Sequence, residues 1–325
     1  MKEFKINANE AGQRFDKYLK KLLKEANTSF IYKMLRKKNI VLNGKKADGT
    51  EKLNVGDEVK LFLADETFDK FHGAATNTKQ FEAYAQIPSI KLDIVYEDDD
   101  VIIINKPVGM LSQKAKPEDI SANEYIIVYL LQSGALTQEA LNTFKPSICN
   151  RLDRNTSGLL IAGKTLKGLQ EMAEALKERS AQKYYRCIVS GALKEKTYLK
   201  GYLSKDERTN KVTIYKTKPA DTNIECLPIE TEYRPIASAN GYTELEVHLI
   251  TGRSHQIRAH LSSIGHPIIG DTKYGSPKVN EVFGRECRLK SQLLHAYRIH
   301  FADGREVIAP TPKAYDKVWE YIEEL

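Results

Sequence analysis

The order of apolar and polar residues predicts two amphipathic helices and a short sheet within residues 1–63. The first helix, over residues 13–24, has a lysine-rich outer side and an apolar face made of Phe15, Leu19, Leu22 and Leu23. The second is expected to start at Thr28 as its N-cap and to bury Ile31, Met34 and Leu35. Asn43-Gly44 predicts a turn, and the alternating Val59, Leu61 and Leu63 predict a strand. This segment is therefore expected to be a small αβ domain.

The pattern changes after residue 63. Residues 64–90 show no sustained periodicity and are interpreted as a linker with a short helix around residues 81–85. In the body, residues 91–325, apolar runs predict strands near 90–96, 101–104, 184–190, 243–250 and 296–301. Helical patterns lie at 165–179 and 255–264. The body is predicted to be an α+β domain with a mainly antiparallel sheet.

The excess of positive over negative charge in the 325-residue chain lies entirely in its first 63 residues. The net charge is +7, and residues 1–63 alone contain 15 Lys and Arg against eight Asp and Glu, so the remainder is neutral. A charged helix face is often only a solvated surface, and cations also suit a helix C-terminus. Concentration of the whole excess in one fifth of the chain favours a polyanion such as RNA. The candidate RNA contacts here are Lys17, Lys21, Arg36, Lys37 and Lys38.

Composition bears on disulfide bonds, metal binding and membrane insertion. The four cysteines, at positions 149, 187, 226 and 287, form no CxxC pattern, which favours reduced thiols. No apolar run approaches the roughly 20 residues of a membrane span, and the N-terminus has no export pattern. We expect a cytoplasmic, monomeric protein that needs no membrane or metal.

Two segments carry candidate chemistry. In Asn150–Gly158 one carboxylate, Asp153, stands between two arginines, an arrangement that also occurs in structural ion pairs. In Thr251–His260 a strand leads into a helix, and two histidines stand five positions apart, which does not fit a zinc pair on one helix face. The residues of this second segment that suit phosphate contacts at a helix N-terminus are Arg253, His255, Gln256 and Arg258.

Two further segments have structural interpretations as well as functional ones. Lys183–Gly191 alternates like a half-buried strand, so Tyr184 and Tyr185 are expected on opposite faces, one in the core and one able to stack on a base. Asn105–Gly109 ends a strand in a rigid turn and is interpreted as a loop that shapes the fold.

Taken together and in this order, these segments strongly resemble the RluA-type family of pseudouridine synthases. The family pattern NKP-x-G, HRLD-x-x-TSG, K-x-Y, GR-x-HQIR-x-H and GHP-x-x-GD-x-x-YG is found here at Asn105–Gly109, Asn150–Gly158, Lys183–Tyr185, Gly252–His260 and Gly265–Gly275. Asn150 replaces the usual His before RLD, and its amide can still donate and accept in a positional role. The beginning of the chain resembles the S-four RNA-binding domain, with Phe15 where that family usually has Leu.

The resemblance implies isomerisation of uridine to pseudouridine in RNA, most of all large-subunit (23S) ribosomal RNA, without a cofactor. It implies Asp153 as nucleophile or proton acceptor, Arg258 as its partner, and Tyr185 as a stacking residue that assists removal of the C5 proton. Arg151 would enter the space that the target uridine leaves, and Asn150 would help to hold the RNA. The alternatives are a transfer-RNA synthase, a non-catalytic RNA-binding or ribosome-assembly factor, and a nucleosidase that uses paired carboxylates.

Overall fold

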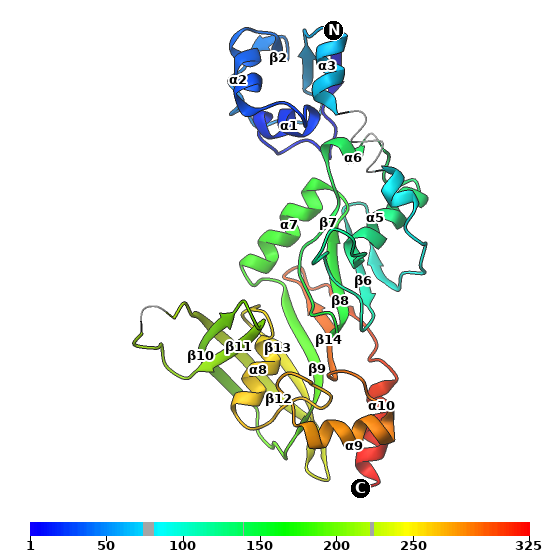
Figure 1. The fold of residues 1–325 in the computed structure, drawn as a ribbon, viewed down its shortest axis with the longest axis vertical. Helices are drawn as coiled ribbons and strands as arrows, with labels where there is room; N and C mark the ends of the chain where they lie inside the picture. The colour runs from blue at the N-terminus through cyan, green and yellow to red at the C-terminus, as the bar shows by residue number, and fades with distance from the viewer. Residues whose placement is uncertain (74–80, 139, 222–223) are drawn as a thin grey trace. The chain divides into compact units, whose positions relative to one another are not determined.

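A computed structural model describes residues 1–73, 81–138, 140–221 and 224–325 (Figure 1). The chain folds into two compact units. The first consists of Met1–Ile102, Gln113–Asn150 and Ile161–Ala173, and the second of Ile103–Ser112, Arg151–Leu160 and Glu174–Leu325. Among the described residues, no helix is long and apolar enough to cross a membrane.

The first unit opens with a small sheet and three helices. Its elements are β1 (Lys2–Lys5), α1 (Phe15–Leu22), α2 (Thr28–Arg36), β2 (Ile40–Leu42), β3 (Lys45–Lys46), β4 (Glu58–Leu61) and α3 (Asp65–His72). The strands pair antiparallel in the order β1-β4-β2-β3. The predicted apolar faces are buried together in one core, Phe15 and Val59 completely. The predicted helices, strand and αβ architecture are therefore confirmed.

Local backbone chemistry explains where these elements begin and end. The N-cap of α2 is Asn27, whose side chain accepts from the amide of Phe30 at 2.8 Å, so the predicted cap at Thr28 is wrong by one residue. Asn43 and Gly44 have φ angles of 51° and 70°. Because two left-handed residues in succession match the twist of a tight hairpin, they join β2 to β3 as predicted.

The predicted linker begins with a helix. In α3, Phe68 is buried in the core of the N-terminal domain, and Nδ1 of His72 lies 2.9 Å from the carbonyl oxygen of Leu22. Phe68 and Phe71 stand three positions apart, a spacing too short to show as periodicity in the sequence. The N-terminal core thus extends at least to Phe68, beyond the predicted limit at residue 63. Residues 81–85 are helical, as expected, and residues 74–80 lie outside the described residues.

The rest of the first unit comprises β5 (Ile94–Glu97), α5 (Ala122–Gln132), α6 (Ala140–Thr143), β7 (Ser147–Ile148) and most of α7 (Leu166–Lys177). Two strands, β6 (Val101–Lys106) and β8 (Ser157–Gly163), contribute residues to both units. Helix α7 confirms the helical pattern at 165–179. β6 and β8 are buried along nearly their whole length, which explains their continuous apolar sequence.

The second unit contains most of the large sheet. Its elements are β9 (Gln182–Ser190), β10 (Thr197–Asp206), β11 (Lys211–Tyr215), β12 (Leu227–Ala239), β13 (Tyr242–Leu249), α8 (Gln256–Ser263), α9 (Pro277–Cys287), β14 (Leu294–His300), β15 (Glu306–Ile308) and α10 (Ala314–Glu323). Within the described chain the strand order is β11-β10-β12-β13-β9-β14-β8-β6-β5, and all pairs from β11 to β14 are antiparallel. The predicted α+β class with a mainly antiparallel sheet is confirmed.

The two faces of this sheet are covered differently. On one face α8 packs beside β11 and β12 (Figure 1). On the other, Ile188 and Tyr242 pack against residues of α9 and α10. Because Tyr185 pairs with Val247 and Tyr184 with His248, the two tyrosines point to opposite faces, as predicted.

The start of β8 approaches β14 closely. Ser157 and Gly158 pair in parallel with His295 and Ala296. Gly158 has a φ of 111°, and a Cβ there would lie 2.2 Å from the carbonyl oxygen of Ala296. Only glycine fits at this position, so the TSG sequence anchors the preceding loop, which carries Asp153, against β14.

Candidate active site

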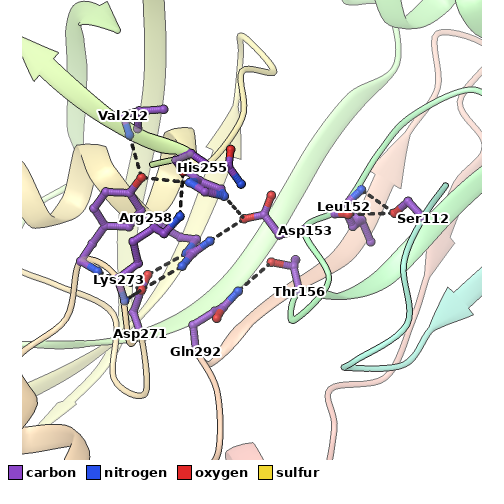
Figure 2. A network of polar contacts seen from close by, with 12 residues as sticks. Ser112, Leu152, Asp153, Thr156, Val212, His255, Arg258, Asp271, Lys273 and Gln292 are labelled. Atoms are coloured by element: carbon purple, nitrogen blue, oxygen red, sulfur yellow. Dashed lines mark hydrogen bonds and ion pairs between the residues drawn. The ribbon is translucent and has the colours of Figure 1, made fainter. Parts of the chain in front are cut away.

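Asp153 lies in the loop before β8, and backbone contacts hold that loop in place. The amide of Thr156 donates to the carbonyl of Asp153 at 3.0 Å, which makes a tight turn. The hydroxyl of Ser112 accepts from the amide of Leu152 at 3.0 Å and donates to its carbonyl at 2.8 Å (Figure 2). The Asp153 side chain is 27% exposed, so its carboxylate is rigidly placed and open to a substrate.

A buried lysine fastens this loop from behind. Lys106, at the end of β6, is 0% exposed and donates to the carbonyls of Pro107, Met110 and Arg154 at 3.0, 2.9 and 3.2 Å. The Gly109 amide and the Arg154 carbonyl add a further bond of 2.9 Å. Burial lowers the pKa of Lys106 to about 8, against the influence of the Asp153 charge, which raises it. The interpretation of Asn105–Gly109 as a loop that shapes the fold agrees with these contacts, and the sequence did not reveal the part that Lys106 plays.

Arg258 in α8 connects two carboxylates. Its Nη1 donates to Oδ2 of Asp153 at 2.8 Å, so the predicted pairing is confirmed. Its Nε and Nη2 donate to Oδ2 and Oδ1 of Asp271 at 2.7 and 2.9 Å (Figure 2). The planar fork of the guanidinium therefore binds Asp271 through two bonds, and Asp153 receives a single bond.

The charges of this network are stable because they compensate one another. Arg258 is 8% exposed and Asp271 is 0% exposed. Desolvation raises the pKa of Asp271, but the hydrogen bonds from Arg258 and from the Lys273 and Tyr274 amides outweigh it and lower the pKa overall. Desolvation disfavours charge on Arg258 too, and the two carboxylates more than offset it, so its pKa is raised. Asp271 thus fixes the guanidinium that in turn positions Asp153.

His255 belongs to the same network. The residue has a left-handed backbone, with φ 54° and ψ 13°, at the N-cap of α8. Its ring is 10% exposed, with Nε2 3.9 Å from Oδ2 of Asp153 and Nδ1 2.9 Å from the hydroxyl of Tyr274. Desolvation lowers the pKa of His255 despite the nearby Asp153 charge. The ring of His255 faces the carboxylate, and its predicted phosphate contact stays a prediction.

Tyr185 lies on the α8 face of the sheet and is buried. Burial and the charge of Asp153 both raise its pKa, so the phenol stays protonated at neutral pH. Tyr184 occupies the other face, stacked on His248 with ring centroids 4.7 Å apart. The structure therefore brings Tyr185, and not Tyr184, into the electrostatic field of Asp153.

Two other predicted RNA contacts are used inside the fold. Gln256 is 2% exposed; it donates to the Glu230 carbonyl and the Thr231 hydroxyl, and it accepts from the Thr251 hydroxyl and the Arg253 amide. Its amide is saturated and cannot reach a phosphate. The Asn150 oxygen accepts from the amide of Ile161 at 2.8 Å, which ties the loop to β8. This bond agrees with the positional role predicted for Asn150, and its contact with RNA stays a prediction.

The remaining predicted RNA contacts are on the surface, with one exception. The exposed ones are Lys17, Arg36, Lys37, Lys38, Arg151 and Arg253. Lys21 instead donates to the Gln13 side chain at 2.9 Å, and burial lowers its pKa. RNA binding by the exposed residues stays a prediction, whereas the Lys21 side chain is partly withdrawn from solvent.

Three residues of the site were not singled out by the sequence: Lys106, Asp271 and Tyr274. All three lie in the quoted motifs. The signal that would have found Asp271 is the rule that an acid in a buried segment needs a cationic partner. Within the described part of the chain, no group of three or more His, Cys, Asp or Glu side chains is arranged to hold a metal ion.

Comparison with solved structures defines the class of the fold. The human proteins RNA Pseudouridylate Synthase Domain Containing 4 and Domain Containing 1 are similar, with TM-scores of 0.58 and 0.54 and identities of 17% and 20%. The matches cover 76% and 74% of this chain and 97% and 98% of those chains. The protein therefore has the pseudouridine synthase fold.

Sequence comparison is more specific. The family model described as RNA pseudouridylate synthase matches residues 100–263. The Ribosomal large subunit pseudouridine synthase C of Rickettsia bellii is 32% identical over 86% of this chain and 94% of that protein. The protein of the same name in Vibrio vulnificus is 29% identical over 96% of this chain and 94% of its own length. The chain belongs to the RNA pseudouridylate synthase family and is an RNA pseudouridine synthase, which confirms the resemblance to the RluA-type enzymes.

Proposed function

We propose that this enzyme converts uridines of large-subunit ribosomal RNA to pseudouridine. Several similar proteins carry the name ribosomal large subunit pseudouridine synthase C. The exposed cations of α1 and α2 suit an RNA backbone. The cytoplasmic location, the monomeric state and independence of metal are parts of the same proposal.

Asp153 is proposed as the reacting carboxylate. The reaction breaks the N1–C1′ bond of uridine, turns the uracil and joins C5 to C1′, while a proton leaves C5 and one is taken up at N1. It needs an ionised carboxylate that reaches the ribose or the base. The observation that carries this proposal is that Arg258 holds only Oδ2 of the half-buried Asp153. Among the described contacts, no bond to Oδ1 is present, which leaves that oxygen to meet the substrate.

Tyr185 is proposed to stack on the detached uracil. Its ring is buried on the face of Asp153, where stacking is worth about 1–3 kcal/mol per base. Its raised pKa disfavours a phenolate, so the proposed assistance in removing the C5 proton is confined to orientation of the base. Arg151, which is exposed in the loop that carries Asp153, is proposed to fill the space left by the extruded uridine.

A nucleosidase with paired carboxylates is disfavoured by the geometry. A second carboxylate, Asp271, does belong to the network. It is 0% exposed and receives two bonds from Arg258. A carboxylate fixed in this way cannot activate water.

The test of Asp153 uses ribosomal RNA labelled with tritium at C5 of uridine. Asp153→Asn keeps the shape and removes the charge, so we expect tritium release to fall by about 10³-fold or more with unchanged RNA affinity. Asp316→Asn, an exposed acid in α10, is the matched control and should be fully active. Normal release by Asp153→Asn would refute the role, and release of free uracil would indicate hydrolysis.

The RNA target is tested in cells. Pseudouridines are mapped in ribosomal and transfer RNA from cells with and without the gene. The proposal requires sites in the large-subunit RNA to disappear with the gene and to return with the wild-type enzyme but not with Asp153→Asn. Loss of transfer-RNA sites alone would replace the proposed target with that class.

A further inference from the structure

Two polar side chains near the Asp153 carboxylate face the same oxygen. Nη1 of Arg258 is 2.8 Å from Oδ2, and Nε2 of His255 is 3.9 Å from that same atom (Figure 2). A carboxylate acts through one oxygen at a time, so groups that occupy Oδ2 determine how Oδ1 is presented. Asp271 holds Arg258 in place, and His255 is held by its own backbone conformation and by Tyr274.

The backbone directs the imidazole toward Asp153 at some cost. The left-handed region is unfavourable for a residue other than glycine, and such conformations gather at functional sites. His255 has this conformation, with φ 54°, and its ring is largely buried. The fold therefore maintains an unfavourable backbone that places Nε2 beside the carboxylate.

The hydroxyl of Tyr274 is placed to favour one tautomer of the His255 ring. The Val212 amide donates to this hydroxyl at 2.9 Å, and Nδ1 of His255 lies 2.9 Å from it. Burial raises the pKa of Tyr274, so the hydroxyl keeps its proton. With Val212 as donor, the only acceptor among the described contacts of this hydroxyl is Nδ1. When Nδ1 accepts, a neutral imidazole carries its hydrogen on Nε2, which faces Asp153.

We propose that His255 is a positioning residue for the reaction: Tyr274 holds it in the Nε2–H form, and with Arg258 it fixes Oδ2 of Asp153 so that Oδ1 is presented to the nucleotide. The inference rests on the proposed role of Asp153 as the reacting carboxylate. Contacts at catalytic carboxylates commonly shorten when substrate binds, so the 3.9 Å separation closes to a hydrogen bond in the complex.

The matched pair His255→Gln and His255→Met tests the donor. Both side chains have similar length and the same backbone requirement, but only Gln carries an N–H near the position of Nε2. We expect Gln to keep the single-turnover rate within about threefold and Met to lower it by about 10–100-fold, with RNA affinity unchanged for both. Equal rates for Gln and Met would overturn the inference. Circular dichroism and thermal unfolding of both variants show whether either one fails to fold.

A pH profile separates positioning from a structural role. The groups that face His255 are Asp153, Arg258, Asp271, Lys273 and Tyr274. Protonated His255 would form an ion pair with Asp153 and weaken it as a nucleophile, so the wild-type rate should fall as pH drops below 6.5 through the lowered pKa. His255→Gln should lack this decline, and a decline that persists unchanged in Gln would refute the proposal.

The role of Tyr274 is tested by a double-mutant cycle. Tyr274→Phe keeps the ring against Arg258 but frees His255 to adopt either tautomer, so we expect about a tenfold loss of rate. The side-chain amide of Gln has no tautomers, so in the His255→Gln background Tyr274→Phe should cause no further loss of rate. An equal loss in both backgrounds would mean that Tyr274 acts only through Val212. If Asp153→Asn proved active, the proposed function itself would fail; if it is inactive while these variants behave like wild type, only the present inference fails.

Discussion

Arg258→Lys is the substitution for which the structure gives the clearest magnitude. Arg258 makes three bonds between charged groups, two to Asp271 and one to Asp153. A lysine ammonium has no planar fork, so it cannot keep both bonds to Asp271. It also cannot keep one bond to Asp271 together with the bond to Asp153, so two of the three bonds are lost. Lysine keeps the positive charge, so the cost is that of the lost hydrogen bonds between charged groups, about 1.5–3 kcal/mol each. We expect the free energy of unfolding to fall by about 3 kcal/mol.

The assay is urea unfolding at neutral pH, followed by circular dichroism, together with single-turnover kinetics. The matched control is Arg253→Lys, an exposed arginine in the same segment, which should change stability by less than about 0.5 kcal/mol and mildly weaken RNA binding. Arg258→Lys should also slow turnover with little change in RNA affinity. A stability change below about 1 kcal/mol would refute the account of Asp271 as a buried, compensated carboxylate.

The remaining predictions concern the base, the pH and the RNA backbone. Tyr185→Phe should retain RNA binding and Tyr185→Leu should weaken it by about 1–3 kcal/mol in filter binding; equal effects would exclude stacking. Burial lowers the pKa of His260 and of His295 to about 4, from 6.5. As the pH falls, these histidines are therefore protonated in the unfolded chain before they are protonated in the folded one. The stabilisation, complete above pH 6.5, should fall by about 2 kcal/mol per histidine between about pH 7 and about pH 5. A free energy of unfolding that does not change over this range in urea unfolding would contradict the prediction. The double change Lys37→Gln and Lys38→Gln should make the log–log salt dependence of binding shallower by about 0.7 per lost single-strand phosphate contact, and an unchanged slope would place these lysines away from the RNA.

Local patterns in the sequence were sufficient to predict the N-terminal domain and the strands that frame the site. Side chains three or four positions apart share a helix face, so the apolar face of α1 predicted its burial. The tyrosines of β9 alternate, so their opposite faces followed from the period of a strand. Asn43-Gly44 specifies its own turn because both residues tolerate a positive φ. Such features depend only on neighbours along the chain.

The roles inside the site depended on tertiary structure. Arg258 and Asp153 are 105 positions apart, and the carbonyl of Arg154 that Lys106 holds is 48 positions from it. In the sequence, Arg258, His255 and Gln256 lie on one short segment, and all three side chains are equally able to bind a phosphate. Packing then buried Gln256 in backbone contacts, turned His255 toward Asp153 and gave the fork of Arg258 to Asp271. A buried polar group must find its partner wherever the fold brings one within reach, and the pairing of distant strands decides which partner that is.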